Sequence, residues 1–358
     1  IEEDEFPIYS DFNLSNLGFS LYHQSSFELN KWTFTAALRM DYEHSFIRYS
    51  NSALMHYRFT LSMPDYKALN TEMEGSGNMP FFEFLPKFSA MYHFHRGNVY
   101  ASVARGYKTG GYNTQIFSDI VQSQMMKGLM SDLGVYFDHV EGSTIESISY
   151  KPEYNWNYEV GGSLSFIDNK LSLDAVLFYI DCRNQQLTVF PPGKTTGRMM
   201  SNAGSTRSYG AESSLSYNDK RLHLNAAYGY TNARFLTYND GNNDYSGNYI
   251  PYAPQNTVSL SAAYTFHLES KHLEAIRIQS DWQGVGKIYW NEDNSFVQPF
   301  YGQSGVSASL EKGKAKLIFW CKNLSDEKFN TFYFKSMGNS FVQQGKPRQI
   351  GVQFQVSF

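Results

Sequence analysis

The closing stretch of the chain, QIGVQFQVSF at residues 349–358, alternates strictly between apolar side chains and polar or small ones. The apolar positions of this stretch are Ile350, Val352, Phe354, Val356 and Phe358. Successive side chains of a β-strand point to opposite faces, so a period of two predicts a strand with one apolar face. The sequence therefore ends on a predicted amphipathic strand.

The same alternation recurs along the whole chain, for example at 32–42, 222–230 and 258–266. Short turns alternate with long connections, and between them we predict about 13 strands. Their ranges are 14–29, 31–49, 82–95, 98–113, 155–167, 171–190, 200–217, 221–239, 248–268, 272–290, 300–311, 314–333 and 347–358. The long connections are predicted at roughly 50–80, 114–154, 191–199, 240–250, 291–299 and 334–346.

Both a β-sandwich and a membrane barrel would show this alternation, and strand length decides between them. Many predicted strands are about 15 residues long or more, whereas strands of soluble sheets usually have about five or six residues. The chain has 5 Trp, 27 Tyr and 28 Phe, together 17 % of its residues, and these gather toward segment ends as interfacial girdles do. We expect an all-β fold, a transmembrane antiparallel β-barrel whose short turns share one rim.

Composition excludes several other classes of protein. The formal net charge of −4 and the lack of a basic cluster argue against a nucleic-acid partner. No apolar run approaches the ~20 residues of a membrane-spanning helix, which argues against a helical membrane protein. Two cysteines, Cys182 and Cys321, do not make a disulfide framework.

The odd number of predicted strands has a consequence for domain organisation. Single-chain bacterial barrels have an even number of strands. We therefore interpret residues 1–358 as a partial C-terminal barrel domain that lacks its first strands. The alternative is a self-contained outer-membrane channel, which would require a closed barrel of 12 or 14 strands.

Several motifs resemble, in the right order, strands of TonB-dependent outer-membrane transporters. WTFTAALRMD at 32–41 resembles the strand with "GLRxD", and VYASVARGYKTGGYN at 99–113 resembles the one ending "SRGFKSGGFN". NYEVGG at 157–162, residues 171–186, NAGSTRSYGAE at 202–212 and PYAPQNT at 251–257 resemble further strands of that barrel. KNLSDEKFNTF at 322–332 and GKPRQIGVQFQVSF at 345–358 resemble its closing segments.

This resemblance implies a 22-stranded barrel that contains an N-terminal plug, of which this chain would supply the last 13 strands. It implies a location in the outer membrane of a Gram-negative bacterium, contact with outer-membrane lipid, and import of a bulky nutrient driven by the TonB–ExbB–ExbD complex through the plug. It also implies that the barrel-assembly machinery reads Phe358 as an assembly signal. The haem-receptor motifs "FRAP" and "NPNL" are not found, so a ferric siderophore is the favoured cargo. Cobalamin, haem and glycans remain alternatives.

Aromatic and polar side chains in the predicted outer loops are the candidate cargo-binding residues. Aromatic faces beside a few donors suit flat, conjugated or charged ligands. The candidates are Tyr107, Lys108, Tyr112, Asn113, Tyr245, Tyr249, Tyr289, Trp290 and Phe334. The competing interpretation is that the aromatic members belong to the outer girdle and that Gly110 and Gly111 only bend the strand.

The long connection after residue 113 contains IFSDIVQSQMMKGLMSDL at 116–133, whose apolar residues recur at roughly helical spacing. We expect a helix there, packed on neighbouring loops, acting as a lid, or docking a surface lipoprotein.

Nothing in the sequence predicts catalysis, a metal or a cofactor. The inward-facing charges, such as Arg39, Asp41 and Glu43, are interpreted as ion pairs within the wall or toward a plug. No GxSxG or HExxH motif is present, so we expect no enzyme. The loop at Asp240, Asn242 and Asp244 lacks the glycine and glutamate that a calcium-binding loop requires.

Overall fold

The computed structural model describes residues 2–3, 6–58, 65–135, 148–190, 198–336 and 339–357. Long antiparallel strands build one large sheet, and short elements lie in the connections between them. The long strands are β2 (Ile8–Leu29), β3 (Trp32–Arg58), β4 (Lys67–Phe94), β5 (Gly97–Lys108), β8 (Glu153–Phe166), β9 (Leu171–Val189), β10 (Met199–Asn218), β11 (Leu222–Tyr238), β12 (Asn256–His267), β13 (Ala275–Gly286), β16 (Tyr301–Lys312), β17 (Ala315–Lys322) and β20 (Gln349–Val356). The short elements are β1 (Glu2–Glu3), β6 (Gly111–Tyr112), η1 (Thr114–Ile116), α1 (Phe117–Asp132), β7 (Ser149–Tyr150), β14 (Ile288–Tyr289), β15 (Val297–Gln298), β18 (Asn330–Ser336) and β19 (Asn339–Gln344).

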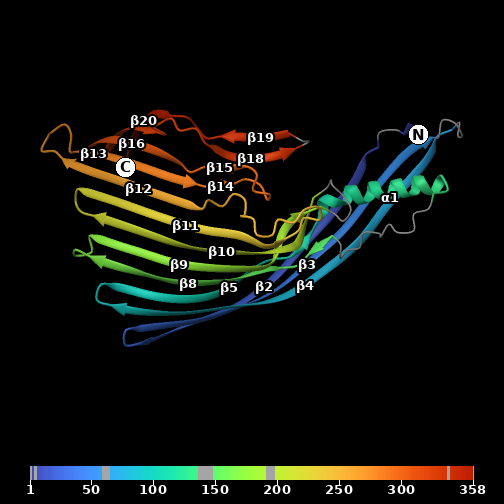
Figure 1. The fold of residues 1–358 in the computed structure, drawn as a ribbon, viewed down its shortest axis with the longest axis horizontal. Coiled ribbons are helices and arrows are strands. Elements are labelled where there is room, and N and C mark those ends of the chain that lie inside the picture. Colours follow the sequence, from blue (N-terminus) through green and yellow to red (C-terminus); the bar gives the residue numbers. More distant parts are fainter. Residues whose placement is uncertain are drawn as a thin grey trace.

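The long strands pair with their neighbours in chain order, as in an up-and-down barrel wall. The sheet runs β3-β4-β5-β8-β9-β10-β11-β12-β13-β16-β17-β20, and β1 and β2 both pair with β3 at the same edge. Within the described residues no ladder joins β2 to β20, so the sheet is open. Figure 1 shows it as a curved wall with the tight hairpins at one end and the long connections, including α1, at the other. The described part of the chain thus shows no closed barrel of the kind that a self-contained channel requires.

The thirteen predicted strands are confirmed as the thirteen long strands of the sheet, but several boundaries were wrong. The connection predicted at 50–80 is mostly strand, because β3 runs to Arg58 and β4 starts at Lys67. The segment 248–268 becomes regular only at Asn256, after Tyr252 takes a positive φ of 63° that a strand does not tolerate.

Two other predicted strands also end earlier than expected. The segment 314–333 stops at Lys322, since Asn323 adopts φ 49° and its side chain bonds to the backbone of Glu327 and Lys346. The segment 98–113 stops at Lys108, and Gly111–Tyr112 instead forms a short bridge to β7.

The two faces of the wall differ sharply in polarity. Large apolar side chains stand exposed on one face, for example Val160 at 57 %, Leu177 at 62 % and Phe354 at 68 % exposure. On β3 this row runs from Trp32 to Tyr42, ten steps of about 3.3 Å at a tilt of about 40°, which spans about 25 Å of membrane thickness. The exposed apolar row is therefore the lipid-facing belt.

The polarity of the faces is exchanged in the upper parts of β2, β3 and β4. Beyond Phe46 the outward positions of β3 become polar, such as Arg48 and Ser50, whereas the inward positions Ile47, Ala53 and Met55 become apolar and buried. Residues 43–58 extend for about 50 Å along the strand. These three strands thus continue beyond the lipid belt as a water-exposed extension with its core on the inward side.

Helix α1 covers that inward side. It buries Phe117, Ile120, Val121, Met125 and Leu129. Their partners on the strands form two adjoining apolar clusters that include Ile47, Ala53, Met55, Tyr57, Leu69 and Met73. The helix predicted at 116–133 is confirmed, and its apolar face packs on β3 and β4.

The sheet splits between β4 and β5 at the level where the extension begins. The β4–β5 ladder ends at the pair Lys87 and Ala104, whereas the β3–β4 ladder continues to Tyr57 and Lys67. The next residue of β4 away from the tight hairpins is Pro86, which has no N–H with which to extend the ladder to β5. Proline thus marks the point where the two halves of the wall separate.

Candidate functional site

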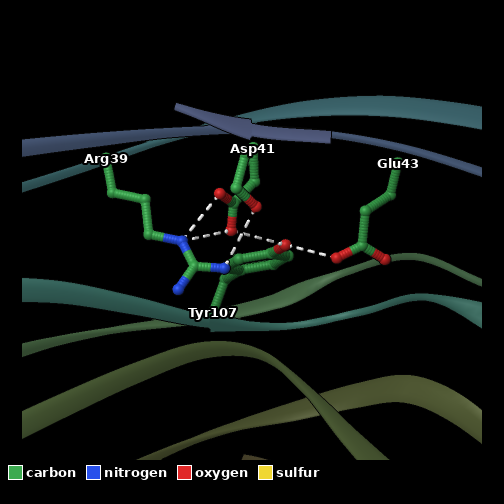
Figure 2. A network of polar contacts seen from close by, with 5 residues as sticks. Arg39, Asp41, Glu43 and Tyr107 are labelled. Atoms are coloured by element: carbon green, nitrogen blue, oxygen red, sulfur yellow. Dashed lines mark hydrogen bonds and ion pairs between the residues drawn. The ribbon is translucent and has the colours of Figure 1, made fainter. Parts of the chain in front are cut away.

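A polar network joins the two sides of this split (Figure 2). The Arg39 Nε lies 2.7 and 3.0 Å from the two carboxylate oxygens of Asp41, which is buried with 1 % exposure. The Tyr107 hydroxyl, from β5, lies 3.0 Å from Asp41 Oδ2 and 2.5 Å from Glu43 Oε1. One hydroxyl proton serves one carboxylate at a time, and the shorter contact identifies Glu43 as its acceptor.

A second ion pair lies beside the first. Arg105 of β5 donates from Nη2 to Glu83 Oε2 at 2.8 Å and from Nη1 to the Phe84 carbonyl at 2.7 Å. The side chains of Arg105 and Glu83 are largely buried. Of the inward charges predicted to pair within the wall, Arg39 and Asp41 do so. Glu43 instead accepts a hydrogen bond from Tyr107, whose hydroxyl is therefore held by the network rather than left open to a ligand.

Lys108 lies at the end of β5 on the face opposite the apolar belt. By strand alternation it shares this face with Tyr100 and Ser102, and its side chain is exposed. Within the described part of the chain, no carboxylate forms an ion pair with Lys108. It is an exposed cation at the mouth of the wall, and Glu153 stands directly opposite it in the β5–β8 ladder without forming an ion pair.

Tyr112 and Asn113 are buried anchors of the connection that carries α1. Tyr112 is 9 % exposed and its hydroxyl donates to the Ser45 carbonyl at 3.4 Å. Asn113, at 1 % exposure, donates from Nδ2 to the carbonyls of Ile148 and Met200 and accepts from the Met200 N–H. These contacts join two parts of the outer rim, and they occupy the polar groups that the sequence assigned to cargo.

Tyr249 and Tyr289 stack on each other with ring centroids 4.9 Å apart and an interplanar angle of 8°. The Arg234 guanidinium lies 3.7 Å from the Tyr249 ring centre, and Lys287 Nζ lies 5.1 Å from that of Tyr289. Arg234 pairs with Arg207 across the ladder, on the same face as the exposed Tyr209 of the belt. This position favours the girdle interpretation for the stack, and its contribution to cargo binding stays a prediction.

Trp290 belongs to a small core under the outer loops. It is 5 % exposed and clusters with Ile288 and Tyr333, while its ring meets Tyr252 edge-on at 5.3 Å. Phe334 differs, because it stands 46 % exposed on the hairpin formed by β18 and β19 and stacks on the equally exposed Phe341 at 4.9 Å. The hairpin therefore presents an aromatic pair to solvent.

Tyr245 lies in a tightly bonded loop after β11. Its ring packs against that of Tyr238 with centroids 5.3 Å apart and planes tilted by 48°, and its hydroxyl donates to Asp240 Oδ2 at 3.2 Å. Burial, followed by the nearby Asp240 carboxylate, raises the pKa of Tyr245 to about 12. Tyr245 is neutral at physiological pH and acts as a hydrogen-bond donor in this loop.

The structure thus divides the nine candidates between different places. Lys108 and Phe334 are exposed, Tyr112, Asn113 and Trp290 are buried, and the remaining tyrosines are tied to neighbours. Sequence reasoning missed Arg234, Lys287 and Phe341. Phe341 could have been found from the sequence, because it lies in a short polar segment that follows the aromatic segment containing Phe334. Arg234 could not, because nothing in the sequence around it indicates contact with Tyr249.

Other kinds of site find no support in the described residues. They contain no group of three or more His, Cys, Asp or Glu side chains arranged to hold a metal ion. No helix in the described ranges is long and apolar enough to cross a bilayer. Phe358, the predicted assembly signal, lies outside the described residues.

The wall consists of long antiparallel strands that pair in chain order and carry one apolar belt. It has tight turns at one rim and folded loops at the other. These features define an outer-membrane β-barrel protein. Residues 4–324 match the family model described as TonB dependent receptor-like, beta-barrel. The chain belongs to this family of TonB-dependent receptors, and its place is the outer membrane of a Gram-negative bacterium. The resemblance seen in the sequence is confirmed.

Solved structures with the same fold include several uptake receptors. The ferric yersiniabactin uptake receptor FyuA from Yersinia pestis is 18 % identical, with a TM-score of 0.63 over 99 % of this chain and 51 % of that one. The siderophore receptor PiuA from Acinetobacter baumannii is 18 % identical, with a TM-score of 0.65 over 97 % and 44 %. The ferric-catecholate import receptor Fiu from E. coli K12 is 15 % identical, with a TM-score of 0.65 over 97 % and 45 %. The chain thus spans about half the length of these receptors.

Proposed function

We propose that this chain is part of the wall of a receptor that imports a ferric siderophore across the outer membrane, driven by the TonB–ExbB–ExbD complex. Family membership supports a receptor or transporter rather than an enzyme. The similar structures named above are receptors for iron chelates, which supports this cargo over cobalamin, haem or a glycan. Coupling to TonB would pass through a plug domain of the whole receptor.

The observation that carries the cargo proposal is Lys108, which is exposed on the inward face of the mouth and forms no ion pair within the described residues. Ferric chelates of the siderophore type are commonly anionic, and a cation facing the mouth attracts an anion without the cost of first breaking an ion pair. The exposed pair of Phe334 and Phe341 adds aromatic faces for a conjugated ligand.

Growth of a deletion strain on a panel of iron sources, cobalamin, haem and glycans tests the proposal directly. We expect growth to fail on one ferric siderophore and to return with the intact gene. Failure on cobalamin or a glycan instead would replace the siderophore with that cargo. Growth on every source would contradict an import function.

A point variant then tests the site. Lys108→Ala should weaken whole-cell binding of that siderophore by about 1–3 kcal/mol, which is about 5- to 150-fold. The matched control is Lys271→Ala, which removes an exposed cation from a tight turn at the other rim. Equal affinity of both variants and wild type, at equal surface levels, would remove Lys108 from the site.

The assembly role of Phe358 is a separate proposal. In the sequence, Phe358 continues the alternating apolar positions 350, 352, 354 and 356, and this pattern supports recognition by the barrel-assembly machinery. Phe358→Ser should lower the amount of folded, heat-modifiable barrel, whereas comparable amounts in both proteins would contradict that role.

A further inference from the structure

An arginine cluster lies on the outward face of β9, β10 and β11, directly above the aromatic end of the lipid belt. The ladders align Tyr158, Tyr179 and Tyr209 in one row across neighbouring strands. Two residues further toward the outer rim, the same ladders align Asp181 with Arg207 and Arg207 with Arg234. Arg183 follows Asp181 on the same face of β9.

The cluster carries more positive charge than its one acid can balance. Arg183 Nε lies 2.8 Å from Asp181 Oδ2, so this carboxylate already has a partner. Arg207 stands directly opposite Arg234 on one side and Asp181 on the other, yet it forms no ion pair within the described residues, and Asp181 Oδ1 has no hydrogen-bond partner there. Like charges directly opposite each other destabilise a sheet. Two neighbouring arginines in this arrangement therefore call for an anion.

Arg234 is held in place by neutral groups, which leaves its charge available. Its Nε donates to Asn232 Oδ1 at 3.3 Å, its Nη1 donates to the Gly247 carbonyl at 2.8 Å, and its plane lies against the Tyr249 ring. Its Nη2 has no bonded partner among the described residues. The guanidinium is thus oriented with a free donor, a geometry that suits a phosphate oxygen.

The depth of the cluster identifies the source of the anion. Aromatic girdles lie at the level of the lipid headgroups, so charges one outward position above the tyrosine row lie where headgroup phosphates are found. The strands β9 to β11 have neighbours on both sides within this chain, as Figure 1 shows, so their outward face is complete here. No other macromolecule needs to be invoked, because a barrel wall at this depth faces lipid.

We propose that Arg207 and Arg234, with Arg183 beside them, bind the phosphorylated headgroup of a lipid of the outer leaflet. The tyrosine row below them would contact the start of its acyl chains. Such a site fixes a lipid on the outer wall of the receptor, away from the inward face assigned to cargo. It rests on the outer-membrane location and not on the identity of the cargo.

The test uses the whole receptor, purified in detergent, and titrates it with lipopolysaccharide whose lipid part carries its phosphates. The apparent affinity is read from the rise in the unfolding temperature of the barrel. We expect the double variant Arg207→Gln/Arg234→Gln to bind about tenfold more weakly than wild type, since two adjacent phosphate-binding cations are lost. The matched control Lys220→Gln/Arg221→Gln removes two cations from a turn at the other rim and should bind as wild type does.

Two further arms separate the lipid from other sources of phosphate. Enzymatically dephosphorylated lipopolysaccharide should lose the effect in wild type. Inorganic phosphate at the same phosphate concentration should not reproduce it. Equal affinity of wild type and the Arg207→Gln/Arg234→Gln variant, retention of the effect after dephosphorylation, or full stabilisation by inorganic phosphate would each overturn the proposal. No arm depends on transport, so failure here leaves the proposed import function untouched.

Discussion

Removing the ring of Phe117 should release helix α1 from the extension without unfolding the barrel wall. Phe117 is 1 % exposed, and its ring lies 4.6 Å from that of Tyr49 and 5.0 Å from that of Phe12. A Phe→Ala change at a site this tightly packed costs about 3–5 kcal/mol. The five buried side chains of α1 contribute about 8–15 kcal/mol to docking at most, counting about 1.5–3 kcal/mol for each.

The change therefore removes about a third of the docking free energy. At 1.36 kcal/mol for each tenfold change, the open population of α1 should rise by about two to three and a half orders of magnitude. Hydrogen exchange of the peptide covering 117–132 measures this rise directly. The control is Met126→Ala, because Met126 is 52 % exposed on the opposite side of the same helix.

We expect faster exchange of the helix in Phe117→Ala, unchanged exchange in Met126→Ala, and the same heat-modifiability of the barrel in both. Equal exchange in the two variants would refute the reasoning that Phe117 anchors the helix. Loss of the folded barrel in Phe117→Ala would refute the inference that the extension has a core of its own.

Four further predictions follow from single contacts. Hydrogen bonds from Lys67, then from Tyr57, hold the pKa of Asp132 below its usual range. The stability that Asp132 adds to helix docking is therefore present above the carboxylate pKa of the unfolded chain and is lost as pH falls through the lowered pKa of the folded state. Hydrogen exchange should show this acid-dependent opening of the helix end in wild type, and Asp132→Asn should remove it. Asn113→Ala removes four hydrogen bonds and should destabilise the 109–135 connection by about 1 kcal/mol for each bond, which should speed its cleavage by protease; equal cleavage would contradict its anchoring role. Gly210→Ala would place a Cβ 1.9 Å from the Tyr230 carbonyl and should lower the unfolding temperature, unlike Gly18→Ala, whose Cβ would meet only Glu43 Cγ at 3.7 Å. Phe354→Arg in the lipid belt should cost about 2–4 kcal/mol in folding assays in lipid if it lies near the bilayer midplane, and Gln353→Arg on the other face should cost far less.

The strands of the wall could be predicted because each carries its own signal. Alternation at 171–189 or 349–356 depends only on neighbours in the sequence, so the long strands and their order were predictable. The upper part of β3 was missed because its apolar positions change from even to odd near Phe46, and a single period cannot describe both halves. The face exchange becomes readable only once the pairing with β2 and β4 is known.

The candidate site was less predictable, because its members are set by contacts between distant segments. Tyr112 and Tyr107 have the composition of a binding loop, but Ser45, Asp41 and Glu43 engage their hydroxyl groups from more than sixty residues away. Arg234 and Tyr249 meet through an isolated bridge that no local pattern announces. Residue type was enough to select the candidates. Only the strand pairing and loop contacts of the structure show which of them are buried, which belong to the aromatic girdle and which are exposed.

The face exchange on β2, β3 and β4 also sets the vertical position of the receptor. Sliding these strands toward the periplasm by one alternation would draw Ser15, His44 and Asn78 toward the hydrocarbon, and sliding them toward the cell exterior would lift Phe19 and Tyr42 into water. Both displacements cost free energy, so the sequence of these three strands fixes the depth at which the barrel sits in the membrane. Helix α1 and the loops are thereby held at a constant height above the cell surface.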